Sequence, residues 1–316
     1  MRYRVSCRTA TLALLSVGIA AAQTGAWKVP RTSDGKPDLQ GTWTNNFATP
    51  LERPAALADK PFFTPEEAEA YEKAARQRPA SNNDTVADTV VWWEKGVKVV
   101  STRRTSMVYD PPNGRIPPLT PAAQKRMADA RAETRKHPNS TPEDFGLMVR
   151  CIVSPVGGPV PMLPGPYNNN YQIVQTPDYV IIVVEMIHDV RIIPIAPARV
   201  PAISSVRQWL GESHGHWEGD TLVVDTTNFT DRTRFRGSDE NLHMIEKFTR
   251  AAHDTLLYQF TVDDPSAFTA PWSAEIPMTT SDGPQYEFAC HEGNQALPNM
   301  MKIAREAEKL KGGGSK

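Results

Sequence analysis

The densest apolar stretch of the chain spans residues 179–195 and reads YVIIVVEMIHDVRIIPI. Most of its residues are β-branched or aromatic, and such residues pack better on a pleated sheet than in a helix. Its polar residues gather near the centre, at Glu185, His188, Asp189 and Arg191. The pattern predicts two core strands that meet at a polar turn.

Similar runs follow one another through the second half of the chain, with turn signals such as Thr176-Pro177-Asp178 and Gly219-Asp220 between them. The predicted strands are residues 171–175, 179–187, 190–195, 221–228, 243–249, 255–262, 272–278 and 285–291. Short strands at hairpin spacing are typical of an antiparallel sheet. The predicted fold class is mainly β, an antiparallel meander or a lipocalin-like barrel.

The first half of the chain is irregular, proline-rich and partly helical. Thr64-Pro65 and Thr120-Pro121 combine an N-cap threonine with proline at the first helical position, which predicts helices over residues 64–76 and 120–135. Thr141-Pro142 opens a third, shorter one. The other expected elements are a strand at 40–44, a strand or hairpin at 97–109, a proline-rich loop at 154–166 and a helical tail at 300–310.

Several motifs carry a resemblance to known proteins. Gly41-x-Trp43 on the first predicted strand resembles the Gly-x-Trp of lipocalin-like barrels, in which the tryptophan closes the barrel floor. The runs DGKPDLQGTW, DPPNGRIPPLTP, NNNYQIVQTPDYV, EMIHDVRIIP, WEGDTLVVDTTNF and FACHEGN resemble those of a large group of uncharacterised exported bacterial proteins. This resemblance implies an exported, β-rich protein and no particular reaction.

Residues 1–22 have the charged, apolar and small-residue order of a secretory signal peptide. The apolar run, residues 10–22, is too short to span a bilayer. We therefore expect cleavage near Ala22 and a periplasmic or secreted protein with no transmembrane segment. The rest divides into a Pro-rich N-terminal region at 23–166, a β core at 167–294 and a helical tail at 295–316.

Charge and cysteine content refine this picture. Loss of residues 1–22 moves the net charge from −1 to −4, which argues against nucleic acid as a partner. In an oxidising compartment the remaining cysteines, Cys151 and Cys290, are expected to form one disulfide. Two buried free thiols are the alternative, and the oligomeric state stays open.

Ionisable residues interrupt the apolar faces of two predicted strands, which is costly unless they find partners. Glu185 continues the predicted face of Ile181, with Arg191 as the nearest cation across the turn. Asp225 interrupts the row of Val223 and Thr227. For both carboxylates two interpretations stay open, a structural ion pair or an acid or base in a barrel interior.

The histidines concentrate in the predicted β region. His188, His243 and His291 are candidates for proton transfer near neutral pH. His243 and Glu246 fall on opposite faces of one predicted strand, so one is expected inside and the other in solvent. The same alternation separates Cys290 from His291, so we do not expect a Cys–His nucleophile.

His214, His216 and Glu218 have the alternating spacing that places metal ligands on one strand face. Glycines at positions 211, 215 and 219 instead predict a mobile loop that leads into a turn. These residues are therefore weak metal candidates. The chain has no H-E-x-x-H, no C-x-x-C and no dinucleotide-binding glycine pattern, so we expect no cofactor. We also expect no G-x-S-x-G nucleophile elbow.

The leading hypothesis is an exported enzyme that performs metal-independent acid–base chemistry, such as elimination, isomerisation or hydrolysis, on a small organic ligand in a barrel pocket. The candidate catalytic residues are Glu185, His188, Arg191, Asp225, His243 and His291. The alternative is a lipocalin-like carrier for a hydrophobic small molecule, and a third possibility is an envelope interaction module. Two interpretations stay open for the aromatic residues Trp92 and Trp93 and for residues 167–171: they bind an aromatic or sugar ligand, or they take part in ordinary packing and turn formation.

Overall fold

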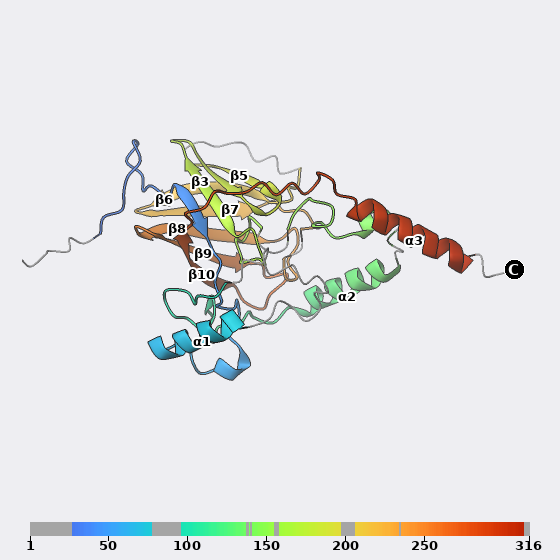
Figure 1. Ribbon diagram of the computed structural model, residues 1–316, viewed down its shortest axis with the longest axis horizontal. Coiled ribbons are helices and arrows are strands. Elements are labelled where there is room, and N and C mark those ends of the chain that lie inside the picture. Colours follow the sequence, from blue (N-terminus) through green and yellow to red (C-terminus); the bar gives the residue numbers. More distant parts are fainter. Residues whose placement is uncertain are drawn as a thin grey trace, which may run out of the picture.

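The computed structural model describes residues 27–77, 96–136, 139, 141–154, 158–196, 206–233 and 235–312. Ten strands form one antiparallel sheet that curls into a nearly closed barrel (Figure 1), so the prediction of a mainly β fold is confirmed. The sheet order is β5-β4-β3-β1-β10-β9-β8-β7-β6, and β2 pairs with β10. The predicted signal peptide lies outside the described residues.

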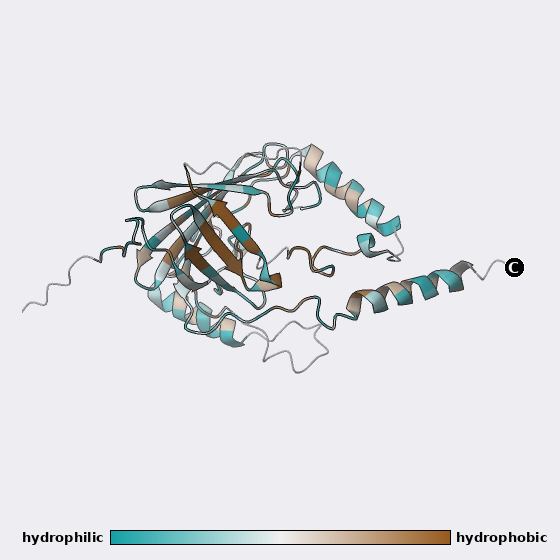
Figure 2. Cartoon of the chain, turned by 90° about the horizontal axis from the view of Figure 1, so that it is seen from above, coloured by the Kyte–Doolittle hydropathy of each residue, from teal (hydrophilic) through white to brown (hydrophobic). Residues whose placement is uncertain are grey.

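The strands are β1 (Gly41–Thr44), β2 (Val108–Asp110), β3 (Asn170–Gln175), β4 (Tyr179–Val184), β5 (Val190–Pro194), β6 (Glu212–Glu218), β7 (Thr221–Thr227), β8 (His243–Ala252), β9 (Thr255–Asp263) and β10 (Trp272–Thr280). The helices are α1 (Pro65–Gln77), α2 (Pro121–Lys136) and α3 (Ala296–Gly312), with 3-10 turns at Ala55–Leu57, Pro142–Asp144 and Met186–His188. Both views show α2 and α3 extending away from the barrel, and Figure 2 shows the apolar residues concentrated on the strands. None of the described helices is long and apolar enough to cross a bilayer.

Large aromatic side chains fill the barrel interior, because alternate residues of each strand point inward. The rings of Phe248 and Phe260 lie 5.1 Å and 5.7 Å from that of Tyr258, and Phe260 also packs edge-to-face on Trp272. Trp43 of β1 is fully buried, and the Arg250 guanidinium lies 5.3 Å from its ring. Because β1 pairs with both β3 and β10, the predicted N-terminal region shares one core with the β region.

The proline-rich loop packs against this interior. Its Met162 is fully buried, donates its backbone N–H to the Tyr258 hydroxyl at 3.1 Å and accepts a hydrogen bond from Asn45 at 2.8 Å. The predicted disulfide between Cys151 and Cys290 is formed and joins the start of this region to the C-terminal segment. The described part of the loop contains no helix or strand, as predicted.

Three predicted elements are wrong. Residues 285–291 form no strand, because this segment runs outside the sheet and contacts it through Gln285 and Tyr286. In the range 97–109 only Val108 and Tyr109 lie in a strand, β2. The glycine-spaced stretch expected to be a mobile loop is strand β6, paired with β7 along its whole length.

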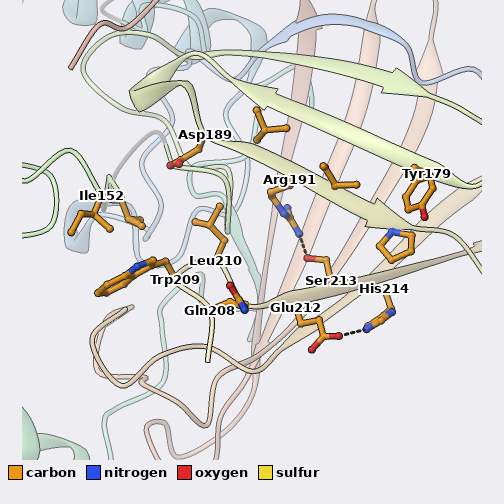
Figure 3. Close-up of a pocket in the computed structure, with 15 residues that line it drawn as sticks. Ile152, Tyr179, Asp189, Arg191, Gln208, Trp209, Leu210, Glu212, Ser213 and His214 are labelled. Carbon is orange, nitrogen blue, oxygen red and sulfur yellow. Dashed lines mark hydrogen bonds and ion pairs between the residues drawn. The ribbon is translucent and has the colours of Figure 1, made fainter. Parts of the chain in front are cut away.

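The barrel is open along one seam. β5 and β6 are the two ends of the sheet order, and they are joined by the parallel bridge Ile195–Gly215, with the Ala196 N–H donating to the Gly215 carbonyl at 2.9 Å. Toward Asp189 and Gln208 the two strands separate (Figure 3). This wedge between β5 and β6 is called the seam below.

Candidate functional site

Glu185 does not pair with Arg191, which corrects the predicted structural pair. β4 ends at Val184, so Glu185 lies in the turn and not on the strand face of Ile181. Its buried carboxylate accepts hydrogen bonds from the Asn170 side chain at 2.8 Å and from the Tyr286 N–H at 3.1 Å. Glu185 therefore fastens the C-terminal segment to the end of β4.

Arg191 instead points into the barrel and forms a two-pronged ion pair with Glu246 of β8, at 3.0 Å and 2.6 Å. Both side chains are buried, and the Tyr258 hydroxyl donates to the same carboxylate at 2.8 Å. Burial, and then the charge of Glu246, raises the pKa of Tyr258 well above its usual value. The expectation that either His243 or Glu246 lies inside is confirmed, with Glu246 as the interior residue.

Asp225 and His243 come together on the outside of the barrel. The inward row of β7 is Leu222, Val224 and Thr226, so Asp225 lies on the outer face of the strand, where it is partly exposed. Asp225 is bonded to the His243 imidazole at 3.1 Å, and both side chains are partly exposed. No hydrogen bond or ion pair among the described residues links this pair to Glu185 or Arg191.

The other candidate histidines lie elsewhere on the surface. His188 is exposed and its Nδ1 lies 2.7 Å from the Phe288 carbonyl. His291 is exposed in the turn that follows the disulfide. The six predicted catalytic residues therefore do not form one cluster. Trp92 and Trp93 lie outside the described residues, and Tyr167 stacks on Phe288.

The predicted metal residues form two separate pairs on the outer face of β6. His214 lies 3.3 Å from Glu212, and His216 lies 3.1 Å from Glu218. Within the described ranges, no group of three or more His, Cys, Asp or Glu side chains is arranged to hold a metal ion.

The cavity at the seam has a volume of about 510 Å³. Its apolar walls come from Ile152, Tyr179, Val190, Ile192, Trp209 and Leu210. Its polar lining comes from Asp189, Arg191, Gln208, Glu212, Ser213 and His214. Figure 3 shows Asp189 and Arg191 on one wall, and Gln208, Trp209 and Glu212 on the other. Apolar walls with a few convergent polar groups are the usual make-up of a small-molecule site.

Asp189 lines this cavity with an incompletely bonded carboxyl group. Its Oδ2 is buried and has no hydrogen-bond partner in the described part of the chain. Burial raises the pKa of Asp189 to about 6, against a smaller lowering by His188. A carboxyl group of this kind can take up or release a proton near neutral pH.

Arg191 and Ser213 connect the seam to the barrel interior. Arg191 donates to Ser213 Oγ at 3.0 Å, and that hydroxyl also lies 2.9 Å from Thr226 Oγ1. Since the Arg191 charge is already balanced by Glu246, the cavity gains a fixed polar contact at Ser213 and little net positive charge.

Residues 211–215 read GESHG and match the pattern G-x-S-x-G, so the expectation that the chain lacks this pattern is wrong. In hydrolases this pattern marks a serine on a sharp strand-to-helix turn. Here Ser213 lies on strand β6 and is bonded to Arg191 and Thr226, neither of which is a base. Within the part of the chain that the structure describes, Ser213 is therefore not assembled into an activated nucleophile.

Comparison of the chain with protein-family models, with curated proteins and with solved structures gives no match. The class of protein that the fold and the site define is a nearly closed antiparallel barrel with an apolar cavity and a perturbed aspartate at its open seam.

Proposed function

We propose that this protein performs metal-independent acid–base chemistry on a small organic molecule bound in the seam cavity. The observation that carries the proposal is that Asp189 lines a largely apolar cavity while its buried Oδ2 has no hydrogen-bond partner among the described residues. The leading hypothesis from the sequence is thus kept, but its site moves from the barrel interior to the seam. Of the predicted catalytic residues, Arg191 lines this cavity.

Each polar residue that lines the cavity has a distinct role in this proposal. Asp189 takes a proton from a carbon or oxygen atom of the ligand, because its raised pKa makes it a stronger base than an ordinary aspartate. Ser213, held by Arg191, fixes a polar group of the ligand. The His214–Glu212 pair on the opposite wall is the second group able to exchange protons. With no activated nucleophile at Ser213, elimination or isomerisation fits better than acyl transfer.

Solvent deuterium incorporation tests this proposal without a known product. Small carbon acids and unsaturated alcohols are incubated with the protein in D2O, and mass spectrometry follows deuterium uptake. We expect uptake into at least one cavity-binding compound, and a loss of about 100-fold or more in Asp189→Asn. Asp282→Asn, which changes an exposed carboxylate outside the cavity, is the matched control and should retain the wild-type rate.

A carrier function is the alternative, and the predominance of apolar residues on the cavity wall favours it. A lipocalin-like carrier would hold its ligand in the barrel interior, whereas aromatic rings fill that space here. A carrier of this fold would therefore bind at the seam. Tight ligand binding without deuterium uptake by any bound compound would support the carrier and remove the enzyme proposal.

Export to the periplasm or medium is part of the same proposal. It is supported by the signal-peptide order of residues 1–22 and by the disulfide, since disulfides persist in oxidising compartments. Intact mass and N-terminal sequencing of protein from a bacterial periplasm should give a start near Gln23. Recovery of the uncleaved chain in the cytoplasm, with Cys151 and Cys290 reduced, would contradict export.

A further inference from the structure

The outer face of β4 and β5 is apolar, although none of the described helices or strands covers it. Ile181 pairs with Ile192 and Val183 pairs with Val190 across the two strands. Ile192 is 61% exposed and Val190 47% exposed. An antiparallel sheet with one solvent face usually alternates apolar and polar residues, so an apolar outer face indicates a binding surface.

This apolar face runs directly into the seam cavity. Tyr179, Val190 and Ile192 belong to the exposed face and also line the cavity. On the opposite wall, Trp209 and Leu210 continue the apolar surface (Figure 3). A ligand whose polar end lies at Asp189 and Ser213 can therefore extend along the outside of β5 without leaving apolar surroundings.

The charges of the cavity restrict the polar end of such a ligand. Asp189 and Glu212 contribute carboxylates, whereas the Arg191 guanidinium is neutralised by Glu246 and His214 is bonded to Glu212. An anionic group placed here would meet like charge in a partly desolvated site. A hydrogen-bond donor, such as a hydroxyl or an amine, would instead satisfy the free carboxyl oxygen of Asp189.

We propose that the ligand of the seam site is an amphiphile, with a hydrogen-bond-donating head at Asp189 and Ser213 and a hydrocarbon part on the outer face of β5. This inference rests on the proposed function of the same cavity. The continuity of the exposed face with the cavity favours a single bound molecule over a docked protein, which would not need the wedge beneath the face.

Calorimetric titration with the 1-alkanols from butanol to octanol tests the hydrocarbon part. Each added methylene should raise affinity about fourfold, as expected for burial of one CH₂ group. Ile192→Ser and Val190→Ser should lower this increment for the longer alkanols. Ile303→Ser, which changes an exposed apolar residue on α3, is the matched control and should leave the increment unchanged.

The head group is tested by comparing octanol and octylamine with octanoate. Octanoate should bind about tenfold more weakly because of the like charge at Asp189 and Glu212. Equal affinity for octanoate would overturn the assigned head group. Affinities that do not change with chain length would overturn the amphiphile, as would capture by phosphatidylcholine vesicles in place of free alkanols.

The two proposals fail in different ways. A fourfold increment per methylene without any deuterium uptake would support the amphiphile and remove the acid–base function. Deuterium uptake only into short, fully polar compounds, with no effect of Ile192→Ser, would support the acid–base function and remove the amphiphile.

Discussion

The raised pKa that suits Asp189 to proton transfer also lowers the free energy of unfolding near neutral pH. The folded protein holds the Asp189 proton more tightly, with a pKa of about 6, than the unfolded chain, in which an aspartate has a pKa of about 3.9. Below about pH 4 the Asp189 side chain is protonated in both states and carries no cost, and the free energy of unfolding falls as the pH rises from there through about 6. Such a penalty is common at sites selected for activity and not for stability.

Asp189→Asn should remove this penalty. We expect the free energy of unfolding to rise by about 1–2 kcal/mol at pH 7.5, allowing for partial exposure to solvent, and to change little at pH 4. Urea unfolding of the wild type and the variant at both pH values measures the difference. Asp282→Asn controls for the loss of one negative charge, and an equal effect of Asp189→Asn at both pH values would contradict the assignment.

The Arg191–Glu246 pair behaves differently because its charges are buried and matched. Glu246→Gln would leave the Arg191 guanidinium charged inside the barrel, so we expect it to cost about 3–5 kcal/mol of unfolding free energy. The double variant Arg191→Met/Glu246→Leu should cost less than Glu246→Gln. Urea unfolding of Arg191→Met, Glu246→Leu and the double variant gives the coupling energy, and additive effects would show that the pair is not a unit.

At the scale of single residues, the sequence predicts which ionisable groups interrupt apolar runs but not which way they face. Glu185 falls one residue beyond the end of β4, which places it in the turn and away from Arg191. Asp225 faces solvent because the inward row of β7 is the other one. Strand alternation leaves two registers open, and only pairing with neighbouring strands decides between them.

At the scale of elements, local capping and β-branched runs are strong signals. The hydroxyl of Thr64 accepts the Glu67 N–H while the Glu67 carboxylate accepts the Thr64 N–H, so the predicted start of α1 is confirmed by a capping box. Strand β6 was missed because its glycines resemble those of a loop. The need for glycine there depends on tertiary contacts that the sequence does not show, since Gly215 lies against Ile195, the residue that follows β5.

Gly211 and Gly219 allow a matched test of these contacts. Both have a positive φ, of 69° and 60°, but a Cβ on Gly211 would lie 2.6 Å from the Thr227 carbonyl oxygen, whereas one on Gly219 would meet nothing within 4 Å. Gly219→Ala should cost about 1–2 kcal/mol for the backbone conformation alone. Gly211→Ala should cost about 1–3 kcal/mol more because of overpacking. Thermal unfolding compares them, and equal costs would contradict the close approach.

At the scale of the whole molecule, the C-terminal segment is fastened to the elements around the seam. Tyr286 is bonded to Glu185, the Phe288 carbonyl to His188, and Cys290 to Cys151. Ile152, the residue after Cys151, lines the cavity, and His188 adjoins Asp189. The predicted residues Glu185 and His188 thus hold the C-terminal segment to the turn that precedes the cavity-lining residue Asp189. The disulfide could be predicted from the sequence, because two cysteines remain in a chain expected to reach an oxidising compartment. Its position beside the cavity could not, because that depends on the path of the folded chain.

The double variant Cys151→Ser/Cys290→Ser should therefore affect both stability and binding. The disulfide closes a separation of 139 residues, so its loss should cost roughly 3–5 kcal/mol of unfolding free energy. Octanol affinity should also fall under conditions where the variant remains folded, because the wall at Ile152 is no longer held to the C-terminal segment. Urea unfolding and calorimetry, each with and without dithiothreitol, separate these effects. Dithiothreitol should reproduce both effects in the wild type and change nothing in the variant. Unchanged octanol affinity in the folded variant would show that the disulfide stabilises the fold without shaping the cavity.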